Sequence, residues 1–500
     1  MARTGQVVLI AMDAAEKDLV LDWAEQGILP NIGAMLHQGL WGIADNPPGL
    51  SGATWPSVYT GCPVTQHGHY FYNRIVPGTY TTEIKAEGDY WRPSFWSVAS
   101  RAGKRVAIVD MPKTLLEPDL NGIQLINWAT HDPDAFEAFE ATPASLKQQV
   151  LADYPGDPMG RNDWGGTGPS DFRRLRDGYI ANIERRTRLV EDFLDRDDWD
   201  LFAVCFDDSH QVGHLCWHIA DAAHPQHDAA LAASVGNPIR DVYAAIDAAI
   251  GRILGRIGPG ATVMLLAPMG MGPNYHATHL LDPLMRKMDG MSTKRGGLYH
   301  FLSWGWRQLP LMFHKPLWDL QIQSRERLMG PDRARRRCFV LPTNEDCGAI
   351  RINLAGREPN GLVRHGAEFD RLCADLECEI MAMADRETGR PLAKRVHRTA
   401  DLFDGGRHDH LPDLIVEWNV DAPFTTATSP THGDLGQAYR GARTGSHQRQ
   451  GFFAVTGPGI AAGELERAVP ATDIAPTVLS LIGLPMPDAA GRPIPEVVNR

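Results

Sequence analysis

The chain has 500 residues, enough for two or three average domains or for one large α/β domain with insertions. Its composition, 43% hydrophobic and 22% charged, is that of an ordinary globular protein. The formal net charge of -12 at pH 7 argues against a general nucleic-acid-binding protein, because phosphate contacts need clustered Lys and Arg side chains.

The N-terminal stretch MARTGQVVLIAMD goes directly into a short apolar run, which is too brief for the core of a signal peptide. No window approaches the roughly 20 apolar residues of a membrane span. The 7 cysteines are an odd number without a CxxC pair, which favours reduced thiols over a disulfide framework. We therefore expect a cytoplasmic protein without an integral membrane segment, and a homo-oligomeric state stays open.

Residues 7–12 (VVLIAM) are continuously apolar and end at Asp13, which predicts a fully buried parallel strand. A helical pattern follows over residues 17–39. Further strand-like runs alternate with helix-like segments: RVAIVDM, DLFAVCF, TVMLLA, LPDLIVEW and GFFAVTG. This alternation predicts an α/β sandwich with a mostly parallel central sheet flanked by helices. Since ligands gather at the carboxyl ends of such strands, we expect one shared site there.

Residues 286–337 break this pattern, with twelve Lys or Arg against four acids, interleaved with aromatic residues. The segment fits an inserted lid or cap over an anionic substrate, an oligomer contact, a membrane-surface patch, or simply a helical insertion with a solvated basic face. We therefore divide the chain into a first part of the core (1–285), the insertion (286–340), and a second part that completes the sheet and the site (341–500).

In the stretch PPGLSGATWPSVYTG, the hydroxyl side chains of Ser51, Thr54 and Ser57 lie at what we expect to be a loop-to-helix junction. A hydroxyl at such a junction faces unpaired amide hydrogens and can help to bind a phosphate or act as a nucleophile. The alternative is that one of them only caps the helix.

The stretch FDDSHQVGHLCWH is the densest cluster of metal-ligand residue types in the chain. His210 and His214 are four residues apart and share one face of a helix, the spacing of helical zinc ligands. A hydrogen-bonded pair of structural histidines is the alternative. His447, in a polar loop before another buried strand, is a candidate third ligand.

Taken in order, several motifs resemble the alkaline phosphatase superfamily, specifically its type I phosphodiesterase and nucleotide pyrophosphatase branch. They are VVLIAMD, TWPSVYTGCPVTQHG, HQVGHLCW, GMGP, IRINLAGREPNGLV, LPDLIVEW, TGSHQRQGFFAVTGPGI and DIAPTVLSLIGLPMPD. The resemblance implies an α/β sandwich that hydrolyses phosphoesters with two metals, usually zinc, and a Thr or Ser nucleophile.

Carried over to this chain, the resemblance implies that Asp13 binds the metal beside the nucleophile. The nucleophile has two candidates. Counting nine residues back from the Thr of the Thr60-Gly61 pair selects Ser51, whereas a proline two residues after the nucleophile selects Thr54. Proline is tolerated in a first helical turn, so Thr54 is stereochemically sound. We keep both and lean slightly toward Ser51.

The other metal of the family is bound by an aspartate and two histidines. Here His210 stands where the aspartate belongs, whereas His214 and His447 match the two histidines. Three imidazoles and an open position are a known zinc arrangement, so we expect one divalent metal, zinc, at these residues.

The metal beside the nucleophile has lost its other two ligands. The family places an Asp-His pair directly before GMG, where this chain has Pro268 and Met269. Proline has no side-chain donor, and a thioether is a poor ligand for such an ion. His276 and His279 nearby are alternative ligands, but we expect this second metal to be absent.

Three functions then remain, all with a small anionic molecule as substrate or ligand. The first is a phosphoester hydrolase or related transferase with a Ser or Thr nucleophile and at most one metal. The second is a biosynthetic enzyme that transfers an acyl, sulfuryl or carbamoyl group. The third is a non-catalytic relative that binds an anionic ligand.

Overall fold

The computed structural model describes residues 5–84, 91–130, 139–156, 168–293, 329–344 and 346–499. The chain divides into two compact units. The first unit consists of Met1–His69, Ala86–Pro273 and Gly441–Arg500, and the second of Tyr70–Lys85 and Asn274–Arg440. Most of the expected insertion, residues 294–328, lies outside the described residues, so its role as a lid stays a prediction.

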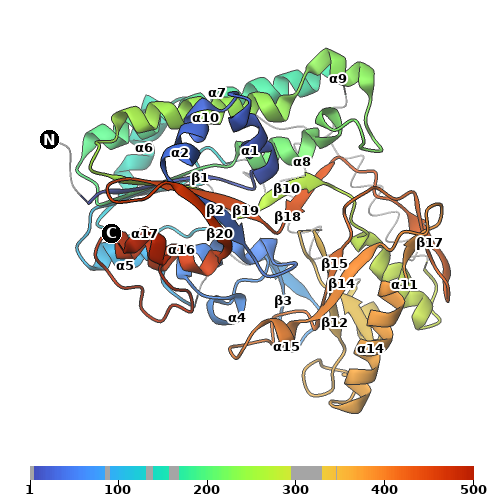
Figure 1. Cartoon of the computed structure of the whole chain (residues 1–500). Coiled ribbons are helices and arrows are strands. Elements are labelled where there is room, and N and C mark those ends of the chain that lie inside the picture. The colour runs from blue at the N-terminus through green and yellow to red at the C-terminus, as the bar shows by residue number, and fades with distance from the viewer. Residues whose placement is uncertain are drawn as a thin grey trace. The chain divides into compact units, whose positions relative to one another are not determined.

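The first unit is built on a nine-stranded sheet in the order β20-β2-β19-β9-β1-β8-β5-β6-β7 (Figure 1). Its strands are β1 (Val7–Met12), β2 (Leu40–Asp45), β5 (Val106–Val109), β6 (Gly122–Ile126), β7 (Glu140–Thr142), β8 (Leu201–Phe206), β9 (Thr262–Ala267), β19 (Gly451–Thr456) and β20 (Gly463–Pro470). Strand β1 pairs in parallel with both β8 and β9, and β5 pairs in parallel with β8 and β6. Antiparallel pairing is confined to β19 with its two neighbours and to β7.

The central strands of this sheet carry no polar face. Every residue of β1, β8 and β9 is buried, as expected where helices cover both sides of a parallel sheet. Figure 1 shows α7 (Pro169–Arg196) and α10 (Pro238–Arg256) above the sheet and α5 (Phe95–Arg101) and α16 (Ile474–Leu481) below it. The expected α/β sandwich with a mostly parallel central sheet is thus confirmed.

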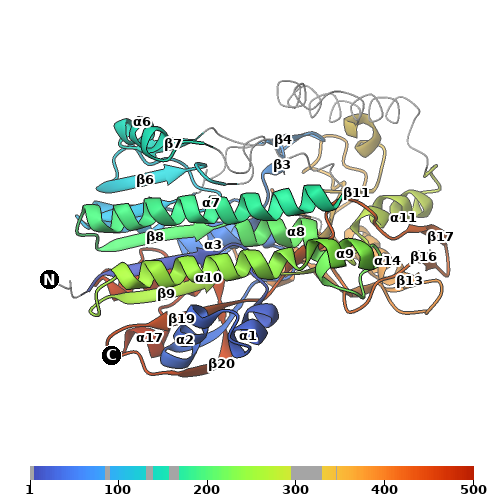
Figure 2. The same ribbon diagram turned by 90° about the horizontal axis from the view of Figure 1, so that it is seen from above.

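The remaining helices of the first unit are shorter, and several of them lie beside α7 and α10 in Figure 2. They are α1 (Lys17–Glu25), α2 (Pro30–Gln38), α3 (Thr54–Thr60), α4 (Val64–His67), α6 (Ala144–Asp153), α8 (Asp208–Ala220), α9 (Ala229–Val235) and α17 (Pro495–Val498). A separate antiparallel pair consists of β10 (Gly270–Pro273) and β18 (Gly445–Gln448). This pair and α8 carry much of the candidate site.

Two details differ from the sequence-based expectation. The helical pattern over residues 17–39 forms two helices, because Gly27 adopts a left-handed φ of 73° and Pro30 opens the next helix. The run LPDLIVEW forms β15 (Leu414–Trp418), which belongs to a sheet of the second unit and not to the central sheet. Apolar runs reveal burial, but not which sheet buries them.

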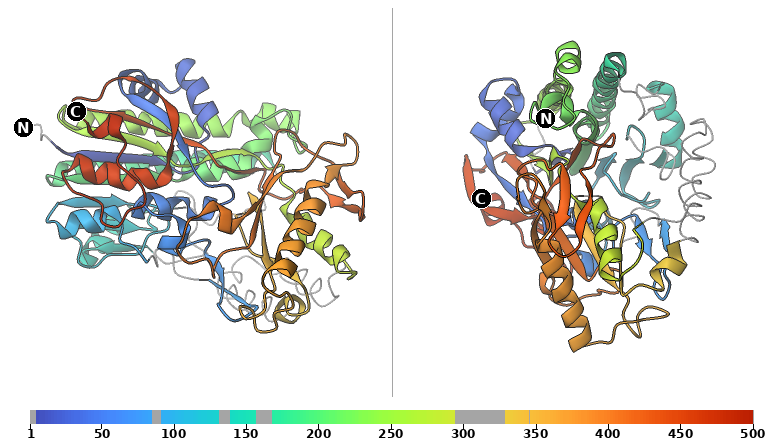
Figure 3. Two further views of the ribbon diagram at one scale, coloured as in Figure 1. Left: turned by 60° about the horizontal axis from the view of Figure 1, so that its bottom comes forward. Right: turned by 90° about the vertical axis from the view of Figure 1, so that its right-hand side faces the viewer.

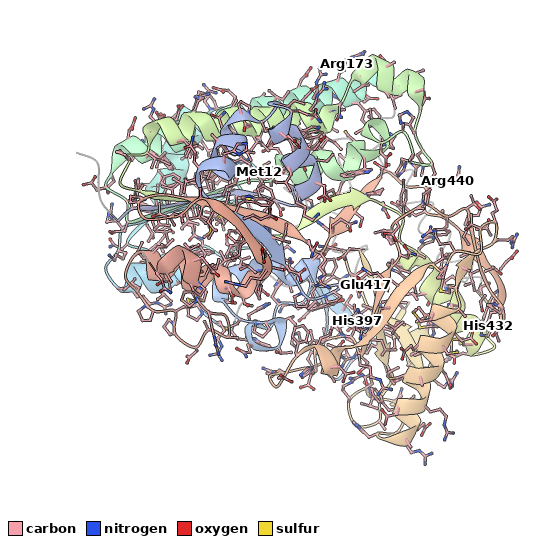
Figure 4. All side chains as sticks on the ribbon, viewed as in Figure 1. Met12, Arg173, His397, Glu417, His432 and Arg440 are labelled. Atoms are coloured by element: carbon pink, nitrogen blue, oxygen red, sulfur yellow. The ribbon has the colours of Figure 1, made fainter. Side chains whose placement is uncertain are left out.

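The second unit contains three small antiparallel sheets. The largest has the order β11-β12-β15-β14 and includes β11 (Cys338–Val340), β12 (Cys347–Ile352) and β14 (Ala393–Arg398). Figure 3 shows α14 (Ala367–Met381) in orange beside this sheet. The labelled side chains of His397 and Glu417 lie together in Figure 4, with 3.0 Å between Nε2 and Oε2.

The other elements of the second unit are short. They are β3 (Asn73–Ile75), β4 (Thr82–Ile84), β13 (Ala384–Asp385), β16 (Thr426–Ser429), β17 (Gly433–Gln437), α11 (Leu281–Met288) and α15 (Thr399–Leu402). The unit has its own hydrophobic core, which includes Leu281, Leu376 and Val416. Among the helices in the described ranges of the whole chain, none is both long and apolar enough to cross a bilayer.

Candidate metal centre and hydroxyl turn

The candidate site begins at the carboxyl edge of the nine-stranded sheet. Strand β1 ends at Met12, which is labelled in Figure 4, and Asp13 follows directly. The parallel neighbours β8 and β9 are followed by Asp207 and Pro268. Because the carboxyl ends of parallel strands meet at one edge, these loops adjoin one another.

Two histidines come from α8, the helix that follows β8. His210 and His214 are four residues apart and therefore share a face of the helix. Their ring centroids are 4.6 Å apart, and the two Nε2 atoms are 2.8 Å apart. His214 is buried and His210 is half-buried, so the pair lies at the rim of the protein interior.

Strand β18 brings a third imidazole to this pair by a close approach between backbones. A Cβ atom on Gly445 would lie 2.2 Å from the carbonyl oxygen of Gly213, so only glycine fits at this crossing. The Thr444 amide donates a 2.7 Å hydrogen bond to the His214 carbonyl. Two residues beyond the crossing, the His447 ring lies 4.8 Å from the His214 ring.

The structure therefore brings together all three histidines that the sequence selected. Candidate ligand nitrogens of His210, His214 and His447 lie within 4.8 Å of one another. Within the described ranges this is the one such group of three or more His, Cys, Asp or Glu side chains. Their assignment as metal ligands stays a prediction.

An oxygen atom close to Nδ1 favours one tautomer in two of these rings. Nδ1 of His214 is 2.8 Å from the carbonyl oxygen of Gly445, and Nδ1 of His210 is 2.9 Å from Oδ2 of Asp13. Both acceptors lack a proton, so in each neutral ring Nδ1 carries the hydrogen and Nε2 carries the lone pair. The two Nε2 atoms then face each other across 2.8 Å, and Nε2 of His214 also lies within hydrogen-bond distance of the Arg443 guanidinium.

The charge state of His214 also suits a metal ligand. Burial lowers the pKa of His214 well below its ordinary value, and the positive charge of Arg443 lowers it further, as protonation of His210 or His447 also would. Arg443 donates from its guanidinium to Nε2 of His214 at 2.7 Å. At neutral pH this imidazole is therefore a neutral lone-pair donor with a fixed cation beside it.

Asp13 contacts both His210 and α3, the helix that follows the turn Ser51–Ala53, which we call the hydroxyl turn. Its Oδ1 accepts a 2.7 Å hydrogen bond from Nε1 of Trp55, and its Oδ2 contacts His210. Burial alone would raise the pKa of Asp13, but the contacts with His210 and Trp55 lower it below its ordinary value. The carboxylate is thus ionised, and each of its oxygens already has a nitrogen partner.

Trp55 connects the candidate nucleophiles to this carboxylate. Ser51 opens a short 3₁₀ turn, η1 (Ser51–Ala53), and Thr54 opens α3 one residue before Trp55. Both hydroxyl side chains are buried. Thr54 Oγ1 donates a long 3.4 Å hydrogen bond back to the Leu50 carbonyl. The third hydroxyl, on Ser57, lies 3.1 Å from Nε2 of His67 and therefore has its own partner.

The loop after β9 offers no ligand side chain. The Pro268 carbonyl accepts a 2.6 Å hydrogen bond from Nδ2 of Asn46, and Met269 is buried in the hydrophobic core. His276 and His279, the alternative ligands, belong to the second unit. In that unit, Nε2 of His279 lies 2.9 Å from the carbonyl oxygen of Gln437. The two residues directly after β9, Pro268 and Met269, provide no suitable metal ligand.

A buried ionic cluster that no sequence pattern predicted lies beside the site. Arg186, on α7, is fully buried and donates to Asp208 at 2.6 Å and to Asp207 at 2.8 Å, with Asp110 at 3.5 Å. Nδ2 of Asn182 donates a further 2.9 Å hydrogen bond to Asp208. The adjacent acids after β8 were visible in the sequence, but their partner on a distant helix was not.

The charged groups of this cluster shift one another's pKa values. Burial alone would lower the pKa of Arg186, but Asp208, Asp207 and Asp110 raise it above its ordinary value. Burial raises the pKa of Asp208, whereas Arg186 opposes that rise. The cluster fixes the first turn of α8, the helix that presents His210 and His214.

No family model matches the chain, and no curated protein matches its sequence. Solved structures do match its fold. Alkaline phosphatase PafA has 13% identity and a TM-score of 0.54, over 100% of this chain and 99% of that chain. Phosphonoacetate hydrolase from Sinorhizobium meliloti 1021, in complex with phosphonoformate, has 14% identity and a TM-score of 0.56, over 96% of each chain. Murine ectonucleotide pyrophosphatase / phosphodiesterase 5 has 11% identity and a TM-score of 0.50, over 97% of each chain.

These likenesses cover nearly the whole chain at low identity, and they show its fold. The chain shares its fold with these three structures, of an alkaline phosphatase, a phosphonoacetate hydrolase and a nucleotide pyrophosphatase / phosphodiesterase. The resemblance seen in the sequence is thereby confirmed for the fold.

The crossing at Gly445 generates a first prediction. The substitution Gly445→Ala should displace β18 from α8, move His447 away from the α8 histidines, and weaken zinc binding at least about tenfold. Calorimetric titration of the metal-free protein with zinc measures this effect. Gly255→Ala is the control, because a Cβ atom on Gly255 meets nothing within 4 Å. Unchanged zinc affinity in Gly445→Ala would contradict the role given to the crossing.

The Arg186 cluster generates a second prediction. Arg186→Met should lower the free energy of unfolding by about 3–5 kcal/mol, because it leaves buried carboxylates without their cation. Denaturant unfolding followed by circular dichroism measures the loss. Arg188→Met, on the exposed face of the same helix, should change it by less than about 0.5 kcal/mol. Equal stabilities of the two variants would show that the cluster contributes little.

His218, one turn beyond His214 on α8, generates a pH prediction. Burial, with smaller contributions from His224 and His227, lowers the pKa of His218 from 6.5 to about 4. As pH falls from 6.5 to 4, the unfolded chain takes up a proton that the folded chain does not, so stability falls by up to about 1.4 kcal/mol per pH unit.

Chemical unfolding of the metal-free protein at several pH values tests this slope. The substitution His218→Gln should flatten the dependence between pH 6.5 and 4 relative to the unsubstituted chain. His37→Gln, at an exposed position on α2, should leave it as it is. If His218→Gln leaves the pH dependence of the free energy of unfolding unchanged, His218 is not the group that causes it.

Proposed function

We propose that this chain is an enzyme of the hydrolase type that acts on a small anionic ester, with one divalent metal held by His210, His214 and His447. Ser51 is the proposed nucleophile and Thr54 the alternative. A phosphoester or a related ester is the proposed substrate. The observation that supports the proposal most is that three imidazoles lie together at the carboxyl edge of the nine-stranded sheet. At the same edge, Trp55 next to the hydroxyl turn donates a hydrogen bond to Asp13.

The donor set fits zinc on the histidine side. Three neutral imidazoles with an open fourth position are a common catalytic zinc arrangement. Metal-bound histidines usually donate their other ring N–H to a carboxylate or a backbone carbonyl, and here His210 and His214 contact Asp13 and Gly445 in this way. A divalent ion held there would supply Lewis-acid polarisation of an ester oxygen.

The donor set does not fit a second metal on the other side. Pro268 and Met269 provide no suitable side chain, and Asp13 already contacts His210 and Trp55. We therefore propose that Asp13 orients His210 and is not itself a ligand. This differs from the direct ligand role that the family resemblance implies.

Three residues of the chain would then have separate roles in ester cleavage. Oγ of Ser51 would attack the esterified centre, the bond to the leaving oxygen would break, and the serine proton would pass through solvent to that oxygen. Arg443, whose guanidinium lies 2.7 Å from His214, would attract and neutralise the anionic substrate. Asp13 would keep His210 in its tautomer.

Transfer of an acyl, sulfuryl or carbamoyl group to an acceptor other than water is a second candidate function. The Pro268-Met269 loop favours it, because phosphoryl transfer in two-metal enzymes relies on the metal that this loop does not support. Failure to turn over phosphodiesters, phosphomonoesters and sulfate esters, with zinc bound, would favour this second function over the first.

The orienting role of Asp13 generates a prediction. Asp13→Asn leaves one acceptor oxygen for two N–H donors, so zinc affinity should fall about 10–100-fold. The stoichiometry should stay the same, which calorimetric titration with zinc measures. Asp22→Asn, at an exposed position on α1, is the control. An affinity within twofold of the unsubstituted chain would contradict the orienting role.

The choice of nucleophile generates another prediction. Ser51→Ala should lower kcat/KM at least about 10³-fold on whichever ester is turned over, because no other group replaces the attacking oxygen. Thr54→Val keeps the shape of the side chain and should stay within about tenfold. Circular dichroism confirms that both variants are folded. The reverse pattern would assign the nucleophile to Thr54 and overturn the preference for Ser51.

A further inference from the structure

The strand that carries His447 belongs to a small separate sheet. Strands β10 and β18 form an antiparallel pair in which Met271 stands opposite His447. An isolated pair of strands is marginally stable, so other contacts of the two strands decide where the pair lies. The close approach at Gly445 holds the first residue of β18 against α8, and a different side chain holds β10.

That side chain is Glu16. Its Oε2 accepts a 3.0 Å hydrogen bond from the backbone amide of Met271. Gly270 permits the approach, because a Cβ atom on Gly270 would lie 2.6 Å from the same carboxylate oxygen. The Glu16 carboxylate therefore lies against the backbone of β10 and is bonded to the residue that stands opposite His447.

Glu16 belongs to the short loop between β1 and α1 that also contains Asp13. The Glu16 amide donates a 3.0 Å hydrogen bond to the hydroxyl of Tyr243, which is buried on α10. Its Oε1 accepts the amide of Asp18, at the start of α1, at 3.3 Å. The loop thus contacts the candidate centre twice, since Asp13 contacts His210 and Glu16 contacts β10.

The charge of this carboxylate changes near neutral pH. Burial raises the pKa of Glu16 from 4.5 to about 7, and the amides of Asp18 and Met271 oppose part of the rise. The Asp18 charge raises this pKa and the Lys17 charge lowers it, whereas Tyr243 presents its hydroxyl and β10 has no titratable side chain. Because an ionised acceptor forms the stronger hydrogen bond, the bond to Met271 is stronger above this pH than below it.

We infer that Glu16 is a positioning residue for the candidate metal centre: by holding the Met271 amide, it fixes β10 and, through the pairing of β10 with β18, the place of His447. This inference rests on the proposed function, which makes His447 a metal ligand. Glu16 itself binds no metal and takes part in no covalent step. A role confined to capping α1 is the alternative, because Glu16 is also the N-cap residue of that helix.

Two substitutions separate these roles. Glu16→Gln removes the charge and keeps the length of the side chain. Glu16→Asp keeps the charge and remains a strong N-cap, but its carboxylate is one methylene shorter and does not reach the Met271 amide. Glu25→Gln is the matched control, because Glu25 is exposed at the other end of α1. Circular dichroism confirms that the variants are folded.

Hydrogen exchange of the metal-free protein at pH 8, followed by mass spectrometry, measures how firmly β10 is held. Glu16→Gln and Glu16→Asp should each exchange at least about tenfold faster in the segment that contains Gly270–Pro273, because its anchoring bond is weakened or lost. Glu25→Gln should exchange like the unsubstituted chain. Unchanged exchange of this segment in both Glu16 variants would overturn the inference.

Calorimetric titration with zinc between pH 6 and pH 8 measures the effect on the centre. The zinc affinity of the unsubstituted chain relative to that of Glu16→Gln should be within about twofold at pH 6 and about tenfold at pH 8. The reason is that Gln resembles the protonated acid at every pH. Taking this ratio cancels the titration of the histidines, which both proteins share.

Glu16→Asp should lose zinc affinity at pH 8 as Glu16→Gln does, which separates the contact with Met271 from attraction between the charge and the ion. A ratio that stays constant with pH, or a Glu16→Asp variant that binds zinc like the unsubstituted chain, would overturn the inference.

Failure of the proposed function gives a different result. If the unsubstituted chain binds no zinc, the proposed metal centre fails, and faster exchange of Gly270–Pro273 in the Glu16 variants then still supports the hold on β10. If every variant binds zinc equally at each pH, the metal centre stands and the positioning role of Glu16 fails.

Discussion

The buried guanidinium of Arg186 is the constraint on which the candidate site depends. It lies among Asp110, Asp207 and Asp208, which follow two neighbouring parallel strands at the same edge of the sheet. Unpaired carboxylates at that depth would cost several kcal/mol each. Once paired, they fix the first turn of α8 and the loop after β5. One buried cation thereby positions both the helix of the histidines and the loop that follows β5.

From that fixed helix, the geometry of the candidate metal centre follows from the approach of two backbones and from the contacts of the histidine rings. Gly445 lets β18 approach the Gly213 carbonyl of α8 closely enough to place His447 beside the helix. The contact with Asp13 and that with the Gly445 carbonyl turn the Nε2 atoms of His210 and His214 toward each other. The arrangement of the three histidines thus depends on the close packing of β18 against α8 and on two oxygen acceptors, the Asp13 carboxylate and the Gly445 carbonyl.

The sequence was informative about the fold and about residue identity, but not about contacts. Continuous apolar runs such as residues 7–12 revealed buried parallel strands, because helices on both faces remove the alternation of polar residues. The spacing of His210 and His214 revealed a shared helix face. The partners of Asp13, and the distant cation Arg186, depend on which segments pack together, and no local pattern encodes that.

The central claim is that this fold holds one metal here and not two. Anomalous diffraction at the zinc edge, from crystals of the chain grown with excess zinc, tests it most directly. The account predicts one strong peak in the candidate site, bonded to His210, His214 and His447, and none beside Asp13 and the Pro268-Met269 loop. A second peak of similar height beside Asp13, or no peak among the three histidines, would contradict it.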